Sequence, residues 1–254
     1  MIMPSPLRGL RAAFVLLTRI PVGGSPYRTQ DFVWAAAHAP FVGLVLGLLL
    51  GGLDRLLLPV GPLPAAVLVI GISLLITGAF HEDGLADTCD ALGGGGGVRE
   101  VLAILKDSRI GAFGGAALVV SIAGRAALLA QLGPSALWTM PIVGCGARVG
   151  PIWLMAWLPY VTSAATAKSG DVTKAGVPQA LVAVTWFVVL LTVAHVSGWI
   201  SAMRASALAT ALIGVTVLMG WRYRIRAGGI TGDFLGASEQ VGEIVALAVL
   251  AWKR

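Results

Sequence analysis

The chain has 254 residues, of which 57% are hydrophobic and only 12% are charged. A typical soluble globular domain has roughly 25% charged residues, so 18 Lys+Arg and 12 Asp+Glu are too few to cover the surface of a soluble protein of this length. The composition excludes an ordinary soluble enzyme and a disordered protein. At roughly 20 apolar residues per crossing, it predicts an all-α, polytopic membrane helix bundle of about six to seven transmembrane helices, in one domain over residues 1–254.

The net charge of +6 does not indicate a nucleic-acid partner, because Lys and Arg gather in the cytoplasmic loops of membrane proteins. The lipid bilayer is the expected partner instead. Cys89 and Cys145 belong to no Cys-x-x-Cys or Cys/His cluster, so the sequence predicts neither a zinc site nor a disulfide framework.

A short amphipathic helix precedes the first long apolar segment. Leu7, Leu10, Phe14 and Leu17 share one helical face, and Pro21 ends the pattern. We expect residues 1–31 to be cytoplasmic, with this helix either lying on the inner leaflet or packed on the bundle.

Six apolar segments follow that lack acidic residues over spanning length: 32–53, 62–80, 112–132, 136–158, 176–203 and 205–221. The last apolar stretch, 244–252, is too short to cross a hydrocarbon core of about 30 Å as a helix. It crosses only if its helix extends back through Glu243 and Glu239; otherwise it lies against the bundle.

The distribution of basic residues predicts the orientation of the bundle. With the N-terminus inside, twelve of the 18 Lys+Arg fall in inner connections and four fall outside, while Arg125 and Arg148 lie within apolar segments. This bias predicts a multi-pass protein of the cytoplasmic (inner) membrane, with segments 81–111 and 222–239 as cytoplasmic loops. Lys253 and Arg254 disagree with this pattern if the last segment crosses.

Four of the twelve acidic residues lie within nine consecutive positions: Glu82, Asp83, Asp87 and Asp90. If this stretch continues the helix of the second span, the three aspartates share one face. Adjacent carboxylates repel each other unless a cation binds between them, and Mg²⁺ takes such oxygen ligands together with phosphate oxygens. The alternative is a solvated acidic loop or a helix cap, but charge beside a membrane helix favours a functional role.

Two glycine-containing segments with charged residues accompany this cluster. Five glycines at 93–97 precede Lys106, Asp107 and Arg109, where backbone N–H groups and basic side chains suit a diphosphate. Asp107 is either another metal ligand or a partner of Arg109. The usual accumulation of Lys and Arg on the cytoplasmic side of membrane proteins explains these basic residues equally well.

The second segment, 228–237, contains four glycines and Asp233, and it follows Arg222, Arg224 and Arg226. Its composition again suits contact with phosphate or a nucleotide. Arg125 and Arg148, set in apolar surroundings, are expected to pair with carboxylates or with a substrate anion.

These segments resemble the signature blocks of the cobalamin synthase family, adenosylcobinamide-GDP ribazoletransferase. The matching strings are FHEDGLADTCDALGGG at 80–95, LKDSRIGAFG at 105–114, GGITGDFLGA at 228–237 and LTRIPV at 17–22. The blocks keep their order over nearly the whole chain. One departure is Ala91, where the family pattern leads us to expect glycine.

The resemblance implies a Mg²⁺-dependent transfer from late vitamin B12 assembly. A hydroxyl of α-ribazole, or of its 5'-phosphate, attacks the cobinamide-side phosphorus of adenosylcobinamide-GDP, and GMP leaves. The substrates are thus small molecules, and a homo-oligomer or an association with other cobalamin-assembly enzymes stays open.

Residue types and placement then suggest roles for this reaction. Asp83, Asp87 and Asp90 are the predicted metal ligands, and Glu82 is either a further ligand or the base, with His81 as the second candidate for the base. Lys106 and Arg109 are predicted to hold the diphosphate. Asp233 is predicted to bind the nucleotide ribose or to complete the metal site.

Two other readings compete with this one. A phosphotransferase of CDP-alcohol type also places aspartates at a helix end. Its motif is D-G-x-x-A-R, but here Asp83-Gly84 is followed by Leu85-Ala86-Asp87-Thr88, so the arginine of that motif is missing. A cation transporter would favour carboxylates deep within the spans and repeated halves, whereas these acidic residues gather at one face.

Overall fold

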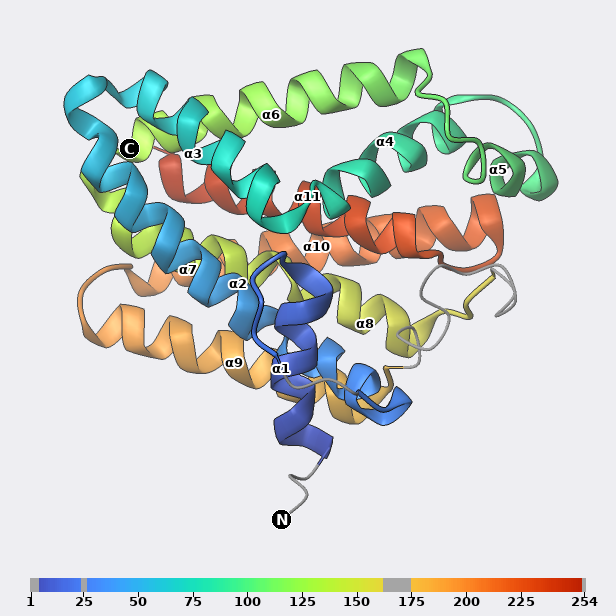
Figure 1. Ribbon diagram of the computed structural model, residues 1–254, viewed down its shortest axis with the longest axis horizontal. Helices are drawn as coiled ribbons and strands as arrows, with labels where there is room; N and C mark the ends of the chain where they lie inside the picture. Colours follow the sequence, from blue (N-terminus) through green and yellow to red (C-terminus); the bar gives the residue numbers. More distant parts are fainter. Residues whose placement is uncertain (1–4, 24–26, 162–174, 253–254) are drawn as a thin grey trace.

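The computed structural model describes residues 5–23, 27–161 and 175–252, and these residues form helices and no strand. The helices are α1 (Ser5–Leu17), α2 (Thr29–Leu57), α3 (Pro62–Thr77), α4 (Phe80–Gly93), α5 (Val98–Ile104), α6 (Ala112–Leu132), α7 (Ala136–Ala147), α8 (Val149–Trp157), α9 (Val177–Val196), α10 (Ala202–Ala227) and α11 (Gly232–Ala251). Two 3₁₀ turns, Leu58–Val60 and Gly133–Ser135, connect neighbouring helices. The predicted all-α class is confirmed (Figure 1).

The number of candidate crossings is five to six, against the six to seven expected. Within the described ranges, five helical runs are long and apolar enough to cross a membrane, or six if α3 and α4 count as one bent span. A seventh crossing is not found there. The basic residues Lys168, Lys174, Lys253 and Arg254 lie outside the described residues.

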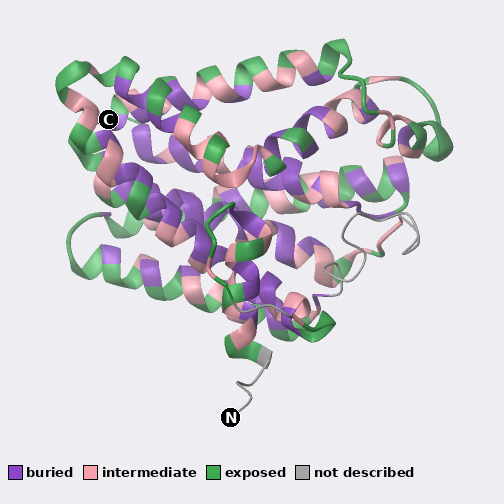
Figure 2. Cartoon of the chain, viewed as in Figure 1, coloured by how far each residue is buried: buried purple, intermediate pink, exposed green. Residues whose placement is uncertain are grey.

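The last apolar stretch belongs to a full-length helix. α11 runs over 20 residues and passes through both Glu239 and Glu243, so the extension that the sequence left open is the one observed. α11 is also the most enclosed candidate span: 61% of its most apolar window is buried, against 11% for α10. Figure 2 shows the corresponding contrast between the buried centre and the exposed outer helices.

The centre of the bundle depends on close backbone contact between α2 and α7. A Cβ at Gly51 would lie 2.7 Å from the carbonyl oxygen of Ala136, and Gly43 and Gly144 face each other further along the same pair. Small residues allow helix backbones to approach in this way inside a membrane.

The acidic stretch does not continue the helix of the second apolar segment, which was the condition considered for the sequence, but forms a separate helix. α3 and α4 meet at an angle of 93°. Gly78 and Ala79 both adopt left-handed backbone conformations, with φ of 73° and 56°, so the α3 hydrogen-bond ladder ends at Thr77. The Arg19 backbone N–H donates to the Ile76 carbonyl oxygen at 2.7 Å, which ties the chain after α1 to this bend.

The N-terminal helix packs on the bundle through one of its faces. Ala12, Ala13 and Leu17 are buried in one cluster with α2 residues. Arg8 donates to the buried carboxylate of Asp31 at 2.8 Å, so an ion pair also joins α1 to α2.

One end of the bundle collects the segments singled out in the sequence, and we call it the acidic end. There α4 ends, α5 follows, α6 begins, α10 ends and α11 begins (Figure 1). Segments 81–111 and 222–239, expected to be loops, consist largely of these helices. Their polar side chains therefore have fixed positions on regular structure.

Candidate active site

Helix α4 separates its acidic residues onto two faces. Asp83 is exposed, and Asp87 and Asp90 are half-buried on the same side. Glu82 is only 5% exposed and points into the bundle. The three aspartates thus share a face, as the spacing predicted, whereas Glu82 lies in different surroundings.

Asp90 caps a neighbouring helix. Its two carboxylate oxygens accept hydrogen bonds from the backbone N–H groups of Gly111 and Gly114, at 2.7 and 2.8 Å. These N–H groups lie at the start of α6, where the helix itself offers them no acceptor. The helix-cap alternative therefore describes Asp90, although the sequence does not indicate which helix it caps.

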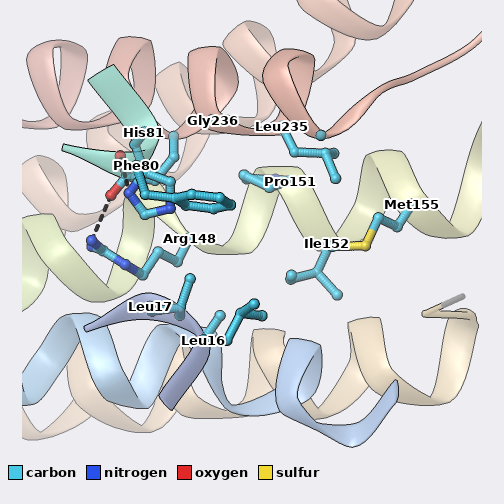
Figure 3. A pocket seen from close by; sticks show the side chains of 13 residues that line it. Leu16, Leu17, Phe80, His81, Arg148, Pro151, Ile152, Met155, Leu235 and Gly236 are labelled. Carbon is cyan, nitrogen blue, oxygen red and sulfur yellow. Dashed lines mark ion pairs between the residues drawn. The ribbon is translucent and has the colours of Figure 1, made fainter. Parts of the chain in front are cut away.

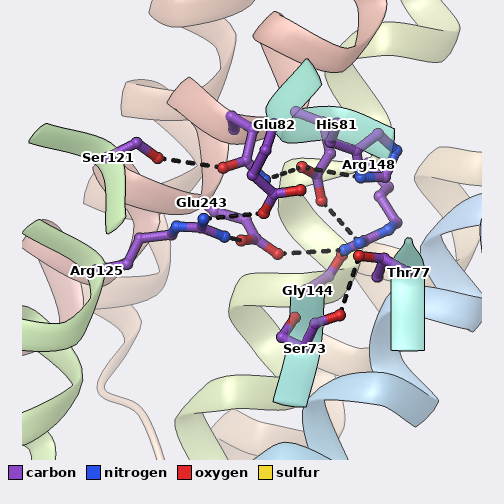
Figure 4. A network of polar contacts seen from close by, with 11 residues as sticks. Ser73, Thr77, His81, Glu82, Ser121, Arg125, Gly144, Arg148 and Glu243 are labelled. Carbon is purple, nitrogen blue, oxygen red and sulfur yellow. Dashed lines mark hydrogen bonds and ion pairs between the residues drawn. The ribbon is translucent and has the colours of Figure 1, made fainter. Parts of the chain in front are cut away.

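Glu82 belongs to a buried ionic network that crosses the centre of the bundle (Figure 4). Arg125 pairs with Glu82 at 2.9 Å and with Glu243 at 3.1 Å. Arg148 pairs with Glu243 at 3.5 Å and with Glu239 at 2.8 Å. The members of the network are Glu82, Arg125, Glu243, Arg148, Glu239 and His81, whose Nδ1 lies 3.3 Å from Glu239.

The network explains how charges remain inside an apolar bundle. Arg125 and Arg148 are 1% and 5% exposed, and each contacts two carboxylates. Of the two partners predicted for these arginines, carboxylates or a substrate anion, the structure shows carboxylates. Burying a charge is costly unless it is paired. One oxygen of Glu82, Oε2, is buried and has no hydrogen-bond partner within the described ranges.

The sequence predicts a site role for Asp233 in α11, but not for Glu239 and Glu243 further along the same helix. In the sequence, these two glutamates bear only on whether the last apolar segment crosses the membrane. In the structure, both contact predicted site residues. Gln240 extends the network, since it donates to Glu239 at 3.0 Å and accepts from Ser121 at 3.2 Å. The available signal was the spacing of Glu239 and Glu243 by one helical turn in an apolar segment.

The two polar segments of the sequence meet where α4 crosses α11. A Cβ at Gly84 would lie 2.8 Å from the Asp233 carbonyl oxygen, so only glycine permits this approach. Thr231 fixes the start of α11, because its side chain accepts from the Phe234 backbone N–H at 3.3 Å. Asp233 therefore lies beside the helix that carries Asp83 and Asp87, as the predicted site requires.

The basic residues of the loop before α6 are exposed. Arg109 donates to Asp107 through Nε at 2.9 Å and through Nη2, so Asp107 is the partner of Arg109. These hydrogen bonds lower the pKa of the Asp107 carboxyl to about 2. Lys106 is exposed beside them. Across the acidic end, Arg226 donates to the Gly94 carbonyl oxygen at 3.0 Å and anchors the start of the glycine run to α10.

The α4 carboxylates are compatible with a cation that also takes phosphate oxygens and water as ligands. Within residues 5–23, 27–161 and 175–252, no three His, Cys, Asp or Glu side chains are grouped closely enough to hold a metal ion. Mg²⁺ commonly uses only one or two carboxylates, together with phosphate oxygens and water. Asp83 and Asp87, one turn apart on α4, match this donor set, and the backbone of Asp233 lies against the same helix at Gly84.

The comparison with known proteins decides the family. The model of the family described as cobalamin-5-phosphate synthase matches residues 9–251. The chain belongs to the cobalamin-5-phosphate synthase family.

Curated relatives in this family are similar over nearly their whole length. The chain is 37% identical to an adenosylcobinamide-GDP ribazoletransferase of Polaromonas sp., covering 94% of each chain. It is 39% identical to the protein of the same name in Rhizobium etli, again over 94% of each. No solved structure matches the chain.

Membership of the cobalamin-5-phosphate synthase family makes the chain an enzyme, a transferase of cobalamin biosynthesis. This excludes the CDP-alcohol phosphotransferase and the cation transporter as alternatives. It confirms the resemblance drawn from the four sequence blocks. The roles of single residues are a separate matter, and they depend on the geometry above.

Proposed function

We propose that the chain joins α-ribazole, or its 5'-phosphate, to the cobinamide phosphate of adenosylcobinamide-GDP. A ribazole hydroxyl oxygen forms a bond to the cobinamide-side phosphorus, the bond from that phosphorus to GMP breaks, and the hydroxyl proton passes to a base. GMP leaves, and adenosylcobalamin or its phosphate forms. The names of the relatives support these substrates.

The observation that carries the proposal is the crossing of α4 and α11 at Gly84 and Asp233. It packs the start of α11, which carries Asp233, against the helix that carries Asp83 and Asp87, from segments about 150 positions apart in the sequence. Phosphoryl transfer depends mainly on positioning and on neutralising charge. A surface with carboxylates for a cation and basic residues for phosphate meets both needs.

We place Mg²⁺ on Asp83 and Asp87, with Asp233 as the third group near it. The ion, when bound, supplies positive charge to the diphosphate oxygens and so favours departure of GMP. Asp90 is left out of this set because both its oxygens cap α6. Glu82 is left out because it faces Arg125 inside the bundle.

Lys106 and Arg109 hold the diphosphate in this proposal, since both are exposed at the acidic end. The Asp107 carboxylate orients the Arg109 guanidinium through its hydrogen bonds. Arg125 and Arg148 act indirectly: they fix Glu82, Glu239 and Glu243 and so hold α4 against α11.

His81 is the proposed proton acceptor. Its Nδ1 lies 3.3 Å from Glu239, which orients the ring, whereas Glu82 is engaged by Arg125. An imidazole oriented by a carboxylate is a common arrangement for a general base.

We place the acidic end, with residues 1–31, on the cytoplasmic side of the inner membrane, in a single membrane domain. The bias of Lys and Arg toward these connections supports this orientation. Both substrates are then supplied from the cytoplasm.

The experiment that tests the function is GMP release by the purified chain in detergent or nanodiscs. We expect GMP and a cobalamin product only when adenosylcobinamide-GDP, α-ribazole or its 5'-phosphate, and Mg²⁺ are all present. Absence of GMP with either acceptor, from a chain that is folded and monodisperse, would refute the proposal.

A further inference from the structure

Tyr223 lies between two exposed arginines, Arg222 and Arg224, at the end of α10 and is itself fully buried. Its ring is stacked on that of Phe234 in α11, with the centroids 4.2 Å apart and the planes inclined by only 3°. The pattern in the sequence indicates a role for the arginines of this segment, whereas the structure shows that its tyrosine is the residue in contact with α11.

The hydroxyl group of Tyr223 contacts the backbone of α11 directly after Asp233. It donates to the Phe234 carbonyl oxygen at 3.0 Å and lies 3.1 Å from the Ser238 hydroxyl, which donates to the same carbonyl oxygen at 2.8 Å. Buried hydroxyl groups require such partners. The residue that follows Asp233 is thus fixed through both its ring and its carbonyl group.

The backbone before Asp233 is fixed by a different part of the chain. Ile230 forms an isolated parallel bridge with Tyr160. The Ile230 N–H donates to the Pro159 carbonyl oxygen at 2.9 Å, and the Val161 N–H donates to the Ile230 carbonyl oxygen at 2.9 Å. The chain that follows α8 therefore holds the residues that lead into α11.

Tyr160 also brings its own hydroxyl group to the start of α11. A Cβ at Gly232 would lie 3.5 Å from the Tyr160 hydroxyl oxygen. Burial raises the pKa of this hydroxyl, the Gly232 backbone N–H lowers it, and the charge of Asp233 raises it further. A neutral hydroxyl group thus lies near Asp233, on the side opposite to Phe234 in the sequence.

The first turn of α11 needs these contacts because it borders a cavity of about 80 Å³ (Figure 3). The α11 residues that line the cavity near this turn are Gly232, Leu235 and Gly236. At 3.6 residues per turn, Phe234 and Ser238 lie on the other side of the helix, and Asp233 lies between the two sides. Close packing therefore fixes the turn on the side of Tyr223 and not on the side of the cavity.

We propose that Tyr223 and Tyr160 are positioning residues for the transfer, and that they hold the first turn of α11 and so the carboxylate of Asp233. This inference rests on the proposed function, in which Asp233 belongs to the site. Asp233 is half-buried, so its carboxylate can reach a ligand while its backbone is held on both sides. A displacement of about 1 Å in such a group can reduce the rate by roughly a hundredfold.

Tyr223→Phe tests the proposal, because it removes the hydroxyl group and keeps the stacked ring. Ser238 still donates to the Phe234 carbonyl oxygen, so the variant should fold. We expect the kcat of GMP release, at saturating substrates and Mg²⁺, to fall by about tenfold. The matched control is Tyr27→Phe, which removes a hydroxyl that donates to the Gly23 carbonyl oxygen between α1 and α2. This control should leave kcat within about twofold.

A double-mutant cycle separates positioning of Asp233 from a general effect on the fold. In an Asp233→Asn background, Tyr223→Phe should change kcat by less than about twofold, because the carboxylate that the tyrosine positions is gone. The same loss of kcat in both backgrounds, or an unchanged kcat in the single variant, would overturn the proposal.

Deuterium exchange on the full chain in nanodiscs, without substrate or Mg²⁺, is a second readout that does not depend on activity. The backbone N–H groups of Phe234 and Leu235 both donate to Thr231. Tyr223→Phe should accelerate their exchange by about fivefold, whereas Tyr27→Phe should not. Unchanged exchange at these two amides would show that the hydroxyl does not fix the turn, against the proposal.

If Tyr223→Phe does not fold, Tyr160→Phe removes the hydroxyl on the other side of Asp233. It should lower kcat in the wild-type background and not in the Asp233→Asn background, and a wild-type kcat would overturn the proposal. A chain that releases GMP and keeps full kcat as Asp233→Asn overturns this inference but leaves the proposed function intact. Wild-type protein that releases no GMP overturns the proposed function, and this inference with it.

Discussion

Gly84 of α4 lies against the backbone of Asp233 in α11, so closely that a Cβ at Gly84 would approach the Asp233 carbonyl oxygen to 2.8 Å. Gly236, one turn further along α11, faces His81 in the same way. Through these contacts, two polar segments that are remote in sequence pack against each other.

Substituting Gly84 should therefore affect activity. Gly84→Ala forces α4 and α11 apart, and a displacement of about 1 Å in a positioned site can reduce turnover by roughly a hundredfold. Gly71→Ala is the matched control, because nothing lies within 4 Å of a Cβ there. GMP release by the two variants, at equal amounts of folded protein, measures the effect. Equal turnover by both would show that the crossing does not position the reacting groups.

The buried ionic network makes Glu243 important for stability, since it lies between Arg125 and Arg148. Glu243→Gln removes the shared carboxylate and should destabilise the fold by about 3–5 kcal/mol, the usual effect of breaking a buried ion pair. The apparent melting temperature in detergent measures this loss. Glu100→Gln, at an exposed glutamate of α5, should leave it unchanged; a similar melting temperature for both variants would contradict the role given to the network.

Much of this arrangement is not available to sequence reasoning. The apolar segments and the blocks at 80–95, 105–114 and 228–237 predict the helices, the membrane setting and the family, because hydropathy and motifs are local. The 93° bend at Gly78 and Ala79, by contrast, depends on left-handed backbone conformations, and one of them is at an alanine.

The partners of single side chains are equally hidden. Arg125 and Arg148 were expected to pair with carboxylates or with a substrate anion, but helix packing decides that Glu82, Glu239 and Glu243 are the partners. The same holds for Asp90, which resembles Asp83 and Asp87 in sequence and differs from them only because α6 begins beside it.

The difference between Asp90 and Asp83 can be measured. Asp90→Asn removes a charged acceptor from the start of α6, and a hydrogen bond to a charged group contributes about 1.5–3 kcal/mol. We expect a lower melting temperature for this variant with the Mg²⁺ concentration for half-maximal activity unchanged. A shift of that Mg²⁺ concentration at unchanged stability would instead make Asp90 a metal ligand.

Arg109 should act on the affinity for the diphosphate substrate. Arg109→Gln removes its positive charge and should raise the KM for adenosylcobinamide-GDP by about tenfold. Arg55→Gln changes an exposed arginine at the opposite end of the bundle and serves as the control. The same KM for both variants would remove Arg109 from the diphosphate site.

The Asp107–Arg109 ion pair leads to a prediction about how activity depends on pH. Because Arg109 lowers the pKa of Asp107 to about 2, this carboxylate stays ionised at neutral pH. A depressed carboxyl pKa contributes stability above the unfolded value, near about 4, and loses it only as the pH falls toward the folded value. The profile of activity between about pH 5 and pH 9 should therefore contain no step that Asp107→Asn removes. A step lost in that variant would show that Asp107 titrates within the working range.

The central claim is that Asp83 and Asp87 hold Mg²⁺ for the transfer, and GMP release by Asp83→Asn as a function of Mg²⁺ concentration tests it most directly. Asp83 is exposed, so the variant should keep the wild-type melting temperature. We predict that the Mg²⁺ concentration for half-maximal GMP release rises by about 10–100-fold. An Asp83→Asn protein with the wild-type Mg²⁺ dependence and full turnover would contradict the account.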